Sequence, residues 1–429
     1  MKTIRKTGNF RDLCKKSMNI LYFGTVCELG SYEALLKNCA EKPSVAPIVF
    51  ESALLRGFFQ NGASVEVHSF PMIPPFSQSR LLKFGGNREN LSCGYSCRWL
   101  KTVNIPVLKQ ISRRMDAHRV IRRWAKANRD TGVIFTYSIP PFLVHDILSC
   151  ARRYHIATAA IIPDLLRDMY MNETPDSWKV KLKNWYLKPA ISVQGDYDGY
   201  IYLTKSMEKV VAPGKPYLVM EGIADPSEAR ISQRREPGPK AVMYAGLLCE
   251  KYGILNLLDG FCMSNLPDAE LWLFGTGTAV PEIRRRMEQD NRIRYFGSVP
   301  REKILFYERK ASLLVNPRDP EELFTQYSFP SKTIEYMLSG TPLLTTKLKG
   351  IPEEYFNYVF TALSNRPEDL AVGIRKALTC SEEDRLRMGA AAQQFIVEKK
   401  NAGAQGARIL AFLEELTDSK KKVSNGEKG

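Results

Sequence analysis

The sequence ASLLVNPRDPEELFTQYSFPSKTIEYMLSGTPLLTT, residues 311–346, contains one complete strand–helix–strand unit. Its apolar ends, 311–317 and 341–346, have the composition of buried strands. Residues 331–339 between them have a helical pattern. Pro330 precedes that pattern and Gly340 follows it, and proline suits the first turn of a helix as glycine suits its end. A strand, a helix and another strand in this order are typical of a parallel sheet covered by helices.

The same alternation extends in both directions along the chain. Strands are predicted at 18–24, 64–70, 131–138, 155–164, 198–204, 241–246, 269–275 and 293–297, in addition to the two above. Helices are predicted at 32–41, 50–60, 106–129, 141–153, 252–263, 279–290, 301–309, 331–339, 366–379 and 383–416. The pattern therefore predicts an α/β protein with two doubly wound, Rossmann-like domains. Ligands of such folds bind in the cleft at the carboxyl ends of the strands.

A polar stretch rich in proline and glycine, 232–240, separates the two series of strands and helices. The resulting division is a basic arm at 1–17, a first domain at 18–205, a linker region at 206–240, a second domain at 241–382, a closing helix at 383–417 and a disordered basic tail at 418–429.

Charge and composition limit the classes of partner. The 429 residues carry a formal net charge of +16, which favours phosphates, nucleic acid or an anionic membrane surface. No nucleic-acid-binding motif accompanies the charge, so nucleic acid is not expected. The nine cysteines form no C-x-x-C pair and only four histidines are present, so we expect no structural zinc and free thiols in a reducing cytosol. We expect neither a signal peptide nor a membrane-spanning helix.

Glu335 is the acidic residue whose position calls for a functional explanation. At about 100° per residue, Ile334, Met337 and Leu338 share one helical face, and Glu335 borders it. The amides at 329–332, including those of Ser331 and Lys332, can receive a phosphate at the helix start. Glu335 can then accept hydrogen bonds from paired hydroxyls such as those of a ribose. The alternative is a surface glutamate on an amphipathic helix.

Residues 324–355, FTQYSFPSKTIEYMLSGTPLLTTKLKGIPEEY, resemble the donor-binding segment of GT-B glycosyltransferases, specifically the GT4-like enzymes of bacterial capsular and exopolysaccharide synthesis. The resemblance covers about 241–360 well and the N-terminal half loosely. It implies transfer of a sugar from a nucleotide-sugar donor to a glycan, with retention of configuration and without a metal or other cofactor. It also implies that Glu335 holds the donor ribose. The family often has another glutamate with seven residues between the two, but that position is Tyr327 here, so the sugar contact falls to Tyr327, Ser328 or backbone.

Two cations are candidates for holding the donor diphosphate. In YAGLLCEKYGI (244–254), Lys251 matches a lysine that binds phosphate in the family, whereas the arginine position of that loop is Leu247 or Leu248. In LVNPRDP (314–320), Arg318 can supply the second charge. The alternatives are a solvated Lys251 and a salt bridge from Arg318 to a neighbouring acid, Asp319 or Glu321.

The first domain is expected to receive the acceptor. Gly24 lies at the end of the first strand, where its backbone can approach a ligand, although an ordinary turn explains it equally well. Asp164 ends the strand at 155–164 and can orient an acceptor hydroxyl; the alternative is a helix N-cap. The triplet Asp196-Tyr197-Asp198 precedes a strand, so it is not expected to bind a metal at the cleft.

Residues 108–129, LKQISRRMDAHRVIRRWAKANR, form a basic amphipathic helix that can rest on anionic lipid. The alternative is a solvated helix whose apolar side packs into its own domain. Membrane contact would suit a lipid-linked acceptor and a cytoplasmic protein peripheral to the inner face of the membrane.

Two other classes of function fit the same outline. A nucleotide-sugar epimerase of similar architecture needs cleft carboxylates and histidines for proton transfer, which the sequence does not visibly supply. A non-catalytic scaffold of polysaccharide assembly would explain the missing first glutamate.

Overall fold

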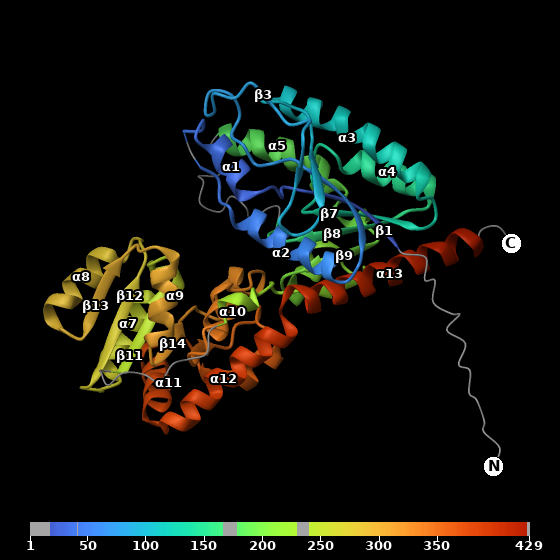
Figure 1. Cartoon of the computed structure of the whole chain (residues 1–429). Coiled ribbons are helices and arrows are strands. Elements are labelled where there is room, and N and C mark those ends of the chain that lie inside the picture. Colours follow the sequence, from blue (N-terminus) through green and yellow to red (C-terminus); the bar gives the residue numbers. More distant parts are fainter. Residues whose placement is uncertain (1–17, 41, 166–177, 230–239, 427–429) are drawn as a thin grey trace, which may run out of the picture.

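The computed structural model describes residues 18–40, 42–165, 178–229 and 240–426. It forms two α/β domains, and the last helix, α13 (Ala402–Gly426), runs from the second domain along the first (Figure 1). The predicted arm at 1–17 and the stretch 230–239 lie outside the described residues. Across the described part, no helix has both the length and the apolar character needed to cross a membrane. Its cysteines, including Cys93 and Cys97, are free thiols.

The first domain is built on an eight-stranded sheet whose order is β10-β9-β8-β7-β1-β2-β5-β4. All neighbours are parallel except β4, which is antiparallel to β5. The strands are β1 (Asn19–Gly24), β2 (Ser64–Ser69), β4 (Arg88–Asn90), β5 (Ser96–Trp99), β7 (Gly132–Tyr137), β8 (Ala157–Ile162), β9 (Gly199–Tyr202) and β10 (Tyr217–Val219). A separate antiparallel pair joins β3 (Lys83–Phe84) to β6 (Thr102–Val103).

The alternation of side chains along β1 explains how both faces of this sheet are covered. Ile20 and Tyr22 point into a core shared with α2 and α13, whereas Leu21 and Phe23 point into a core shared with α3 and α4. The helices of this domain are α1 (Leu29–Leu36), α2 (Ala46–Gln60), α3 (Leu108–Ala127), α4 (Val144–Tyr154), α5 (Trp178–Ser192) and α6 (Glu208–Val211).

The second domain has a six-stranded parallel sheet with the order β13-β12-β11-β14-β15-β16. Its strands are β11 (Lys240–Ala245), β12 (Ala269–Phe274), β13 (Ile293–Gly297), β14 (Leu313–Asn316), β15 (Leu343–Thr346) and β16 (Phe360–Ala362). Its helices are α7 (Ile254–Met263), α8 (Val280–Gln289), α9 (Arg301–Lys310), α10 (Lys332–Leu338), α11 (Pro367–Thr379) and α12 (Glu382–Lys399). Val242 and Tyr244 of β11 face the core with α7 and α11, and Met243 and Ala245 face α10 and α12. The prediction of two doubly wound domains is confirmed.

The single helix predicted at 383–416 is instead two helices, α12 and α13, which meet at Lys400 and Asn401. Lys400 is buried at the point where the chain returns to the first domain, and its ammonium pairs with Glu221 (3.2 Å) and Glu354 (2.7 Å). Beyond it, α13 crosses α2 so closely that a Cβ on Gly57 would lie 2.1 Å from the Ala402 carbonyl oxygen.

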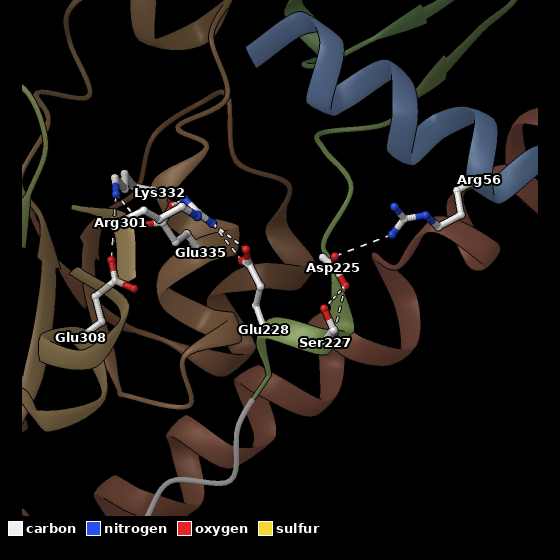
Figure 2. Close-up of polar contacts among 8 residues, drawn as sticks. All are labelled: Arg56, Asp225, Ser227, Glu228, Arg301, Glu308, Lys332 and Glu335. Atoms are coloured by element: carbon white, nitrogen blue, oxygen red, sulfur yellow. Dashed lines mark hydrogen bonds and ion pairs between the residues drawn. The ribbon is translucent and has the colours of Figure 1, made fainter. Parts of the chain in front are cut away.

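Two stretches predicted to lack regular structure are ordered. Residues 418–426, expected to belong to a disordered tail, continue α13, and Lys420 pairs with Asp198 of the first domain (2.6 Å). In the region expected to be a linker, 217–219 form the edge strand β10. The described part of that region ends in a 3-10 helix, η4 (Pro226–Glu228), which lies between the two domains (Figure 2).

Candidate functional site

Glu335 lies at the centre of a charged cluster in the second domain. As the helical pattern predicted, Ile334, Met337 and Leu338 of α10 are buried and Glu335 is partly exposed. Its carboxylate pairs with Lys332 one turn earlier and with Arg301 of α9, at 3.2 Å. Burial opposes the ionisation of Glu335, but Lys332, a hydrogen bond from Glu308 and the charge of Arg301 hold its pKa below the ordinary value. The group is therefore a carboxylate at neutral pH, and both of its oxygens can accept hydrogen bonds from hydroxyl groups.

Arg301 extends this cluster to the segment between the domains. One guanidinium nitrogen reaches Glu335, and another donates to both carboxylate oxygens of Glu228 in η4, at 2.9 and 3.0 Å (Figure 2). Asp225, the N-cap residue of this 3-10 helix, accepts a hydrogen bond from the Ser227 N–H (2.9 Å) and pairs with Arg56 of α2 (3.7 Å). The segment 225–228 thus makes ionic contacts with both domains. The role of Arg301 was not predictable from the sequence, because its two partners are distant along the chain.

Lys251 and Arg318 lie on loops that leave the carboxyl ends of two adjacent strands, β11 and β14. Lys251 belongs to η5 (Glu250–Tyr252), and its ammonium lies 4.4 Å from the Phe324 ring centroid. The Arg318 guanidinium lies 4.6 Å from the ring of Tyr252, which in turn contacts Phe324 edge to face. The two cations are therefore held in one aromatic cluster.

Neither cation has a carboxylate partner among the residues that the structure describes. Through the described parts of the chain, no ion pair joins Lys251 or Arg318 to an acid. The alternative of a salt bridge from Arg318 to Asp319 or Glu321 is not realised, because Asp319 accepts a hydrogen bond from the Glu321 N–H instead (2.9 Å). Burial lowers the pKa of the half-buried Arg318 guanidinium, the expected effect of desolvating a cation that has no counter-ion. This arrangement is suited to binding an anion.

Tyr336 connects the two groups of charges. Its buried hydroxyl donates to the Ala245 carbonyl (3.1 Å) and accepts from the Ala245 N–H (2.8 Å), which fixes α10 to the carboxyl end of β11. Glu335 directly precedes Tyr336 on α10, and Arg318 lies on the loop after β14, the strand next to β11. The candidate ribose carboxylate and the candidate diphosphate cations therefore share one edge of the sheet.

The predicted tight turn after β12 lies at the same edge. Gly275 has φ +126°, and a Cβ there would lie 1.8 Å from the Gly246 carbonyl oxygen, so the loops after β11 and β12 can approach only with glycine. The Leu248 N–H donates to the Thr276 carbonyl (2.8 Å) and holds the loop of Lys251 against this turn.

Among the described residues, no ion pair or side-chain hydrogen bond joins Tyr327, Ser331 or Asp164 to the charged cluster, although the Ser331 carbonyl accepts the Glu335 N–H (3.3 Å). Ser331 precedes α10, is exposed, and makes no side-chain capping bond. Tyr327 packs against an apolar cluster of the first domain that includes Leu165, the neighbour of Asp164. Just after β9, the Thr204 hydroxyl donates to the Gln326 carbonyl (2.7 Å), so the loops after β9 and β14 meet between the domains. The alternative of an N-cap at Asp164 cannot be compared, since 166–177 lie outside the described residues.

Gly24 has a structural explanation that the sequence analysis missed. A Cβ at this position would lie 1.8 Å from an Oε2 of Glu51, a fully buried residue of α2. The Glu51 carboxylate accepts bonds from the Tyr22 hydroxyl (2.6 Å), the Thr25 N–H (2.9 Å) and the Thr25 hydroxyl. The loop after β1 is thus hydrogen-bonded to the buried Glu51 carboxyl, and its first amides point toward that group.

The titration of Glu51 gives a testable effect on stability. Burial raises its pKa to about 7 although the hydrogen bonds from Thr25 and Tyr22 act in the opposite direction. A carboxyl whose folded pKa exceeds its unfolded pKa of about 4.5 contributes stability that is present below that pH and lost as the pH rises to about 7, roughly 3 kcal/mol. Glu51→Gln does not titrate, so its melting temperature relative to wild type should rise across this range. A difference that stays constant with pH would contradict the assignment.

The Asp196-Tyr197-Asp198 triplet has a structural role at its second acid. Asp198 accepts bonds from the N–H and hydroxyl of Thr158 (both 2.9 Å) and pairs with Lys420 of α13. It therefore fastens β8 and the last helix at the start of β9.

Comparison with known proteins gives a family for part of the chain. Residues 239–380 match the family model described as glycosyl transferases group 1. A comparison with curated protein sequences gave no match.

Solved structures match nearly the whole chain. Anabaena HepE in complex with UDP is 13% identical, covers 93% of this chain and 100% of its own, and has a TM-score of 0.57. Sucrose-phosphate synthase from Thermosynechococcus elongatus is 14% identical, with coverage of 94% and 100% and a TM-score of 0.58. A glycosyltransferase from Rickettsia africae is 12% identical, with coverage of 93% and 98% and a TM-score of 0.58. At such identities the likeness shows the fold alone: the chain has the GT-B fold, two Rossmann-like domains in succession, and its second domain contains the segment similar to glycosyl transferases group 1.

Proposed function

We propose that the protein is a glycosyltransferase that moves a sugar from a nucleotide-sugar donor to a growing glycan. The observation that carries the proposal is the pair of cations Lys251 and Arg318, which have no counter-ion within the described residues, at the edge of the sheet that also holds Glu335. The group 1 match over 239–380 covers all three residues, and the HepE structure of the same fold was solved with UDP.

In this proposal the second domain holds the nucleotide. Glu335 accepts hydrogen bonds from the ribose hydroxyls, with Lys332 beside it and Ser331 at the start of α10. Arg301 and Lys332 use one oxygen each of the Glu335 carboxylate, which leaves further lone pairs for a diol. Lys251 and Arg318 bind the diphosphate. Tyr327 stands where the related enzymes have their first glutamate, so the contact to the sugar falls to Tyr327, Ser328 or the backbone.

The proposed chemistry consists of positioning and charge stabilisation. The bond from the anomeric carbon to the diphosphate breaks, and the acceptor hydroxyl forms the new bond to that carbon, with retention of configuration as in the GT4 enzymes the sequence resembles. Negative charge develops on the departing diphosphate, and preorganised cations stabilise it without a metal. Asp164, at the carboxyl end of β8 in the first domain, orients the acceptor hydroxyl. Closure of the domains excludes water and suppresses hydrolysis of the donor.

The experiment that tests this function is a thermal-shift screen against UDP-, GDP-, ADP- and dTDP-sugars without added metal. A donor at about a hundred times its dissociation constant should stabilise the protein by about 2.7 kcal/mol. One hit identifies the base and supplies the substrate for assays of acceptors. No shift with any nucleotide would contradict the proposal, and binding without release of a nucleoside diphosphate would favour a scaffold. Interconversion of the donor without an acceptor would favour an epimerase.

We further propose that α3 rests on an anionic membrane surface that carries a lipid-linked acceptor, at the cytoplasmic face. The buried side of α3 includes Val120 and Trp124, which pack into their own domain. Ile111 and Met115 do not: they are 47% and 57% exposed. Val107 and Leu108 are further exposed apolar residues at this end. Exposed basic residues lie among them and toward the other end of the helix: Arg114, Arg119, Arg122, Arg123 and Lys126. An exposed apolar end next to a basic surface is typical of a helix that binds anionic lipid.

Replacing Ile111 and Met115 together with serine is expected to weaken binding to vesicles of anionic phospholipid by about tenfold or more, because each inserted apolar side chain contributes about 1 kcal/mol or more. Sedimentation with phosphatidylglycerol vesicles, and with phosphatidylcholine vesicles for comparison, measures this effect. Val372→Ser is the matched control, since Val372 is an equally exposed apolar residue on α11 of the other domain. Equal sedimentation of wild type and the double variant would contradict the membrane proposal.

A further inference from the structure

Glu308 is a buried acid directly beneath the candidate ribose site. It lies on α9 with no exposed surface, and Lys332 approaches one of its carboxyl oxygens to 3.9 Å (Figure 2). Within the described chain, neither carboxyl oxygen receives a hydrogen bond from an N–H or hydroxyl group. The Lys332 ammonium that approaches Glu308 also pairs with the Glu335 carboxylate, so the two acids face the same cation. Two carboxylates can only accept hydrogen bonds, so a hydrogen bond between these neighbouring acids requires a proton on one of them.

The charges of the cluster show which acid carries the proton. Lys332 and Arg301 supply two positive charges, and Glu335 and Glu228 supply two negative charges, so the cluster is neutral only if Glu308 is neutral. Glu335 keeps the closer contact with Lys332, while Glu308 is the more buried acid. Tyr336, a buried phenol on the same helix as Glu335, also lies beside this pair. Burial, together with the charge of Glu335, raises the pKa of Glu308 far above that of an ordinary carboxyl.

We propose that Glu308 is a positioning residue that, as a neutral acid, donates a hydrogen bond to Glu335 and holds that carboxylate in place for a nucleotide ribose. Loss of this proton at alkaline pH weakens nucleotide binding. The inference rests on the proposed function, because it assigns Glu335 to the ribose.

Ionisation of Glu308 acts on the site in two ways. It removes the hydrogen bond that orients Glu335, and it attracts Lys332, which then has two carboxylates within reach instead of one. It also adds a negative charge beneath a site that has to receive an anionic nucleotide. Both effects lower the affinity of the site for the nucleotide.

Two substitutions at Glu308 distinguish the effect of its titratable proton from the effect of its hydrogen-bond donor, while the size of the side chain stays similar. Glu308→Gln keeps the size and an N–H donor toward Glu335 but has no proton to lose. Glu308→Leu keeps an uncharged side chain of similar size and removes the donor. The affinities of wild type and both variants for UDP and for GDP are measured by calorimetry from neutral to alkaline pH.

At neutral pH, Glu308→Gln should bind the nucleotide within about twofold of wild type, and Glu308→Leu about fivefold more weakly, as expected for one lost hydrogen bond. With rising pH, wild type should lose affinity and Glu308→Gln should not. The same alkaline loss in Glu308→Gln as in wild type would overturn the proposal.

A second measurement needs no nucleotide and therefore separates this inference from the proposed function. The melting temperature of Glu308→Gln relative to wild type should rise as the pH increases, because only wild type must keep a proton on a buried acid. If this difference in melting temperature rises with pH but no nucleotide binds, Glu308 is a neutral acid as proposed, but Glu335 does not bind a ribose. If the difference in melting temperature does not change with pH, Glu308 does not carry the proposed proton, and the inference is wrong.

Discussion

Replacing Lys251 or Arg318 with alanine is expected to lower the turnover of a nucleotide-sugar by about 10²–10³-fold in each case. The reason is that each cation already lies against an aromatic ring, with no carboxylate partner in the described part of the chain, before the diphosphate arrives. No existing salt bridge has to break when the leaving group gains charge. The release of nucleoside diphosphate from the donor found by thermal shift measures this effect.

Lys310→Ala is the matched control for the loss of Lys251. Lys310 also lies over an aromatic ring, that of Phe306 at 4.7 Å, but it ends α9 just before β14 and so lies at the opposite edge of the sheet. Its removal should leave turnover unchanged. If Lys251→Ala and Arg318→Ala were both as active as Lys310→Ala, the diphosphate would have to bind elsewhere, and the main support for the proposed function would be lost.

The periodicity of the sequence was sufficient to predict the two sheets, because their central strands are long apolar runs. Strands of two or three residues, such as Lys83–Phe84 and Phe360–Ala362, have no periodicity to detect. The break between α12 and α13 was also undetectable. It occurs at Lys400 and Asn401, without proline or glycine, and depends on Glu221 and Glu354, which are distant along the chain.

Residues of the candidate site were predictable from the sequence only where the pattern of a single helix distinguishes them. Glu335 was identified because it is an acid bordering an apolar face. The same criterion would have found Glu51, which has Ile48 three residues before it and Leu55 four residues after it. Glu308 could not be found in this way, because α9 is rich in charge and tertiary packing alone decides that this acid is buried.

Glu335→Ala is expected to weaken nucleotide binding by about 10–150-fold, the equivalent of 1.5–3 kcal/mol for hydrogen bonds to a charged group. The fold should survive. Lys332 can then pair with Glu308, and Arg301 keeps its two bonds to Glu228, so no cation of the cluster is left without an acid. Calorimetry with UDP and GDP measures the affinity, and thermal unfolding without ligand measures the stability.

Glu228→Gln distinguishes the ribose role of Glu335 from its role in the charged cluster. This substitution removes the charge of the other acid that Arg301 binds, but it leaves the Glu335 carboxylate in place. If Glu335 binds the ribose directly, Glu228→Gln should change nucleotide affinity by less than about threefold, the scale of an exposed ion pair. If both variants lose affinity equally, Glu335 acts only by holding Arg301, and the ribose contact must be assigned to Arg301 or to the backbone after β13. If neither loses affinity, the nucleotide does not bind at α10.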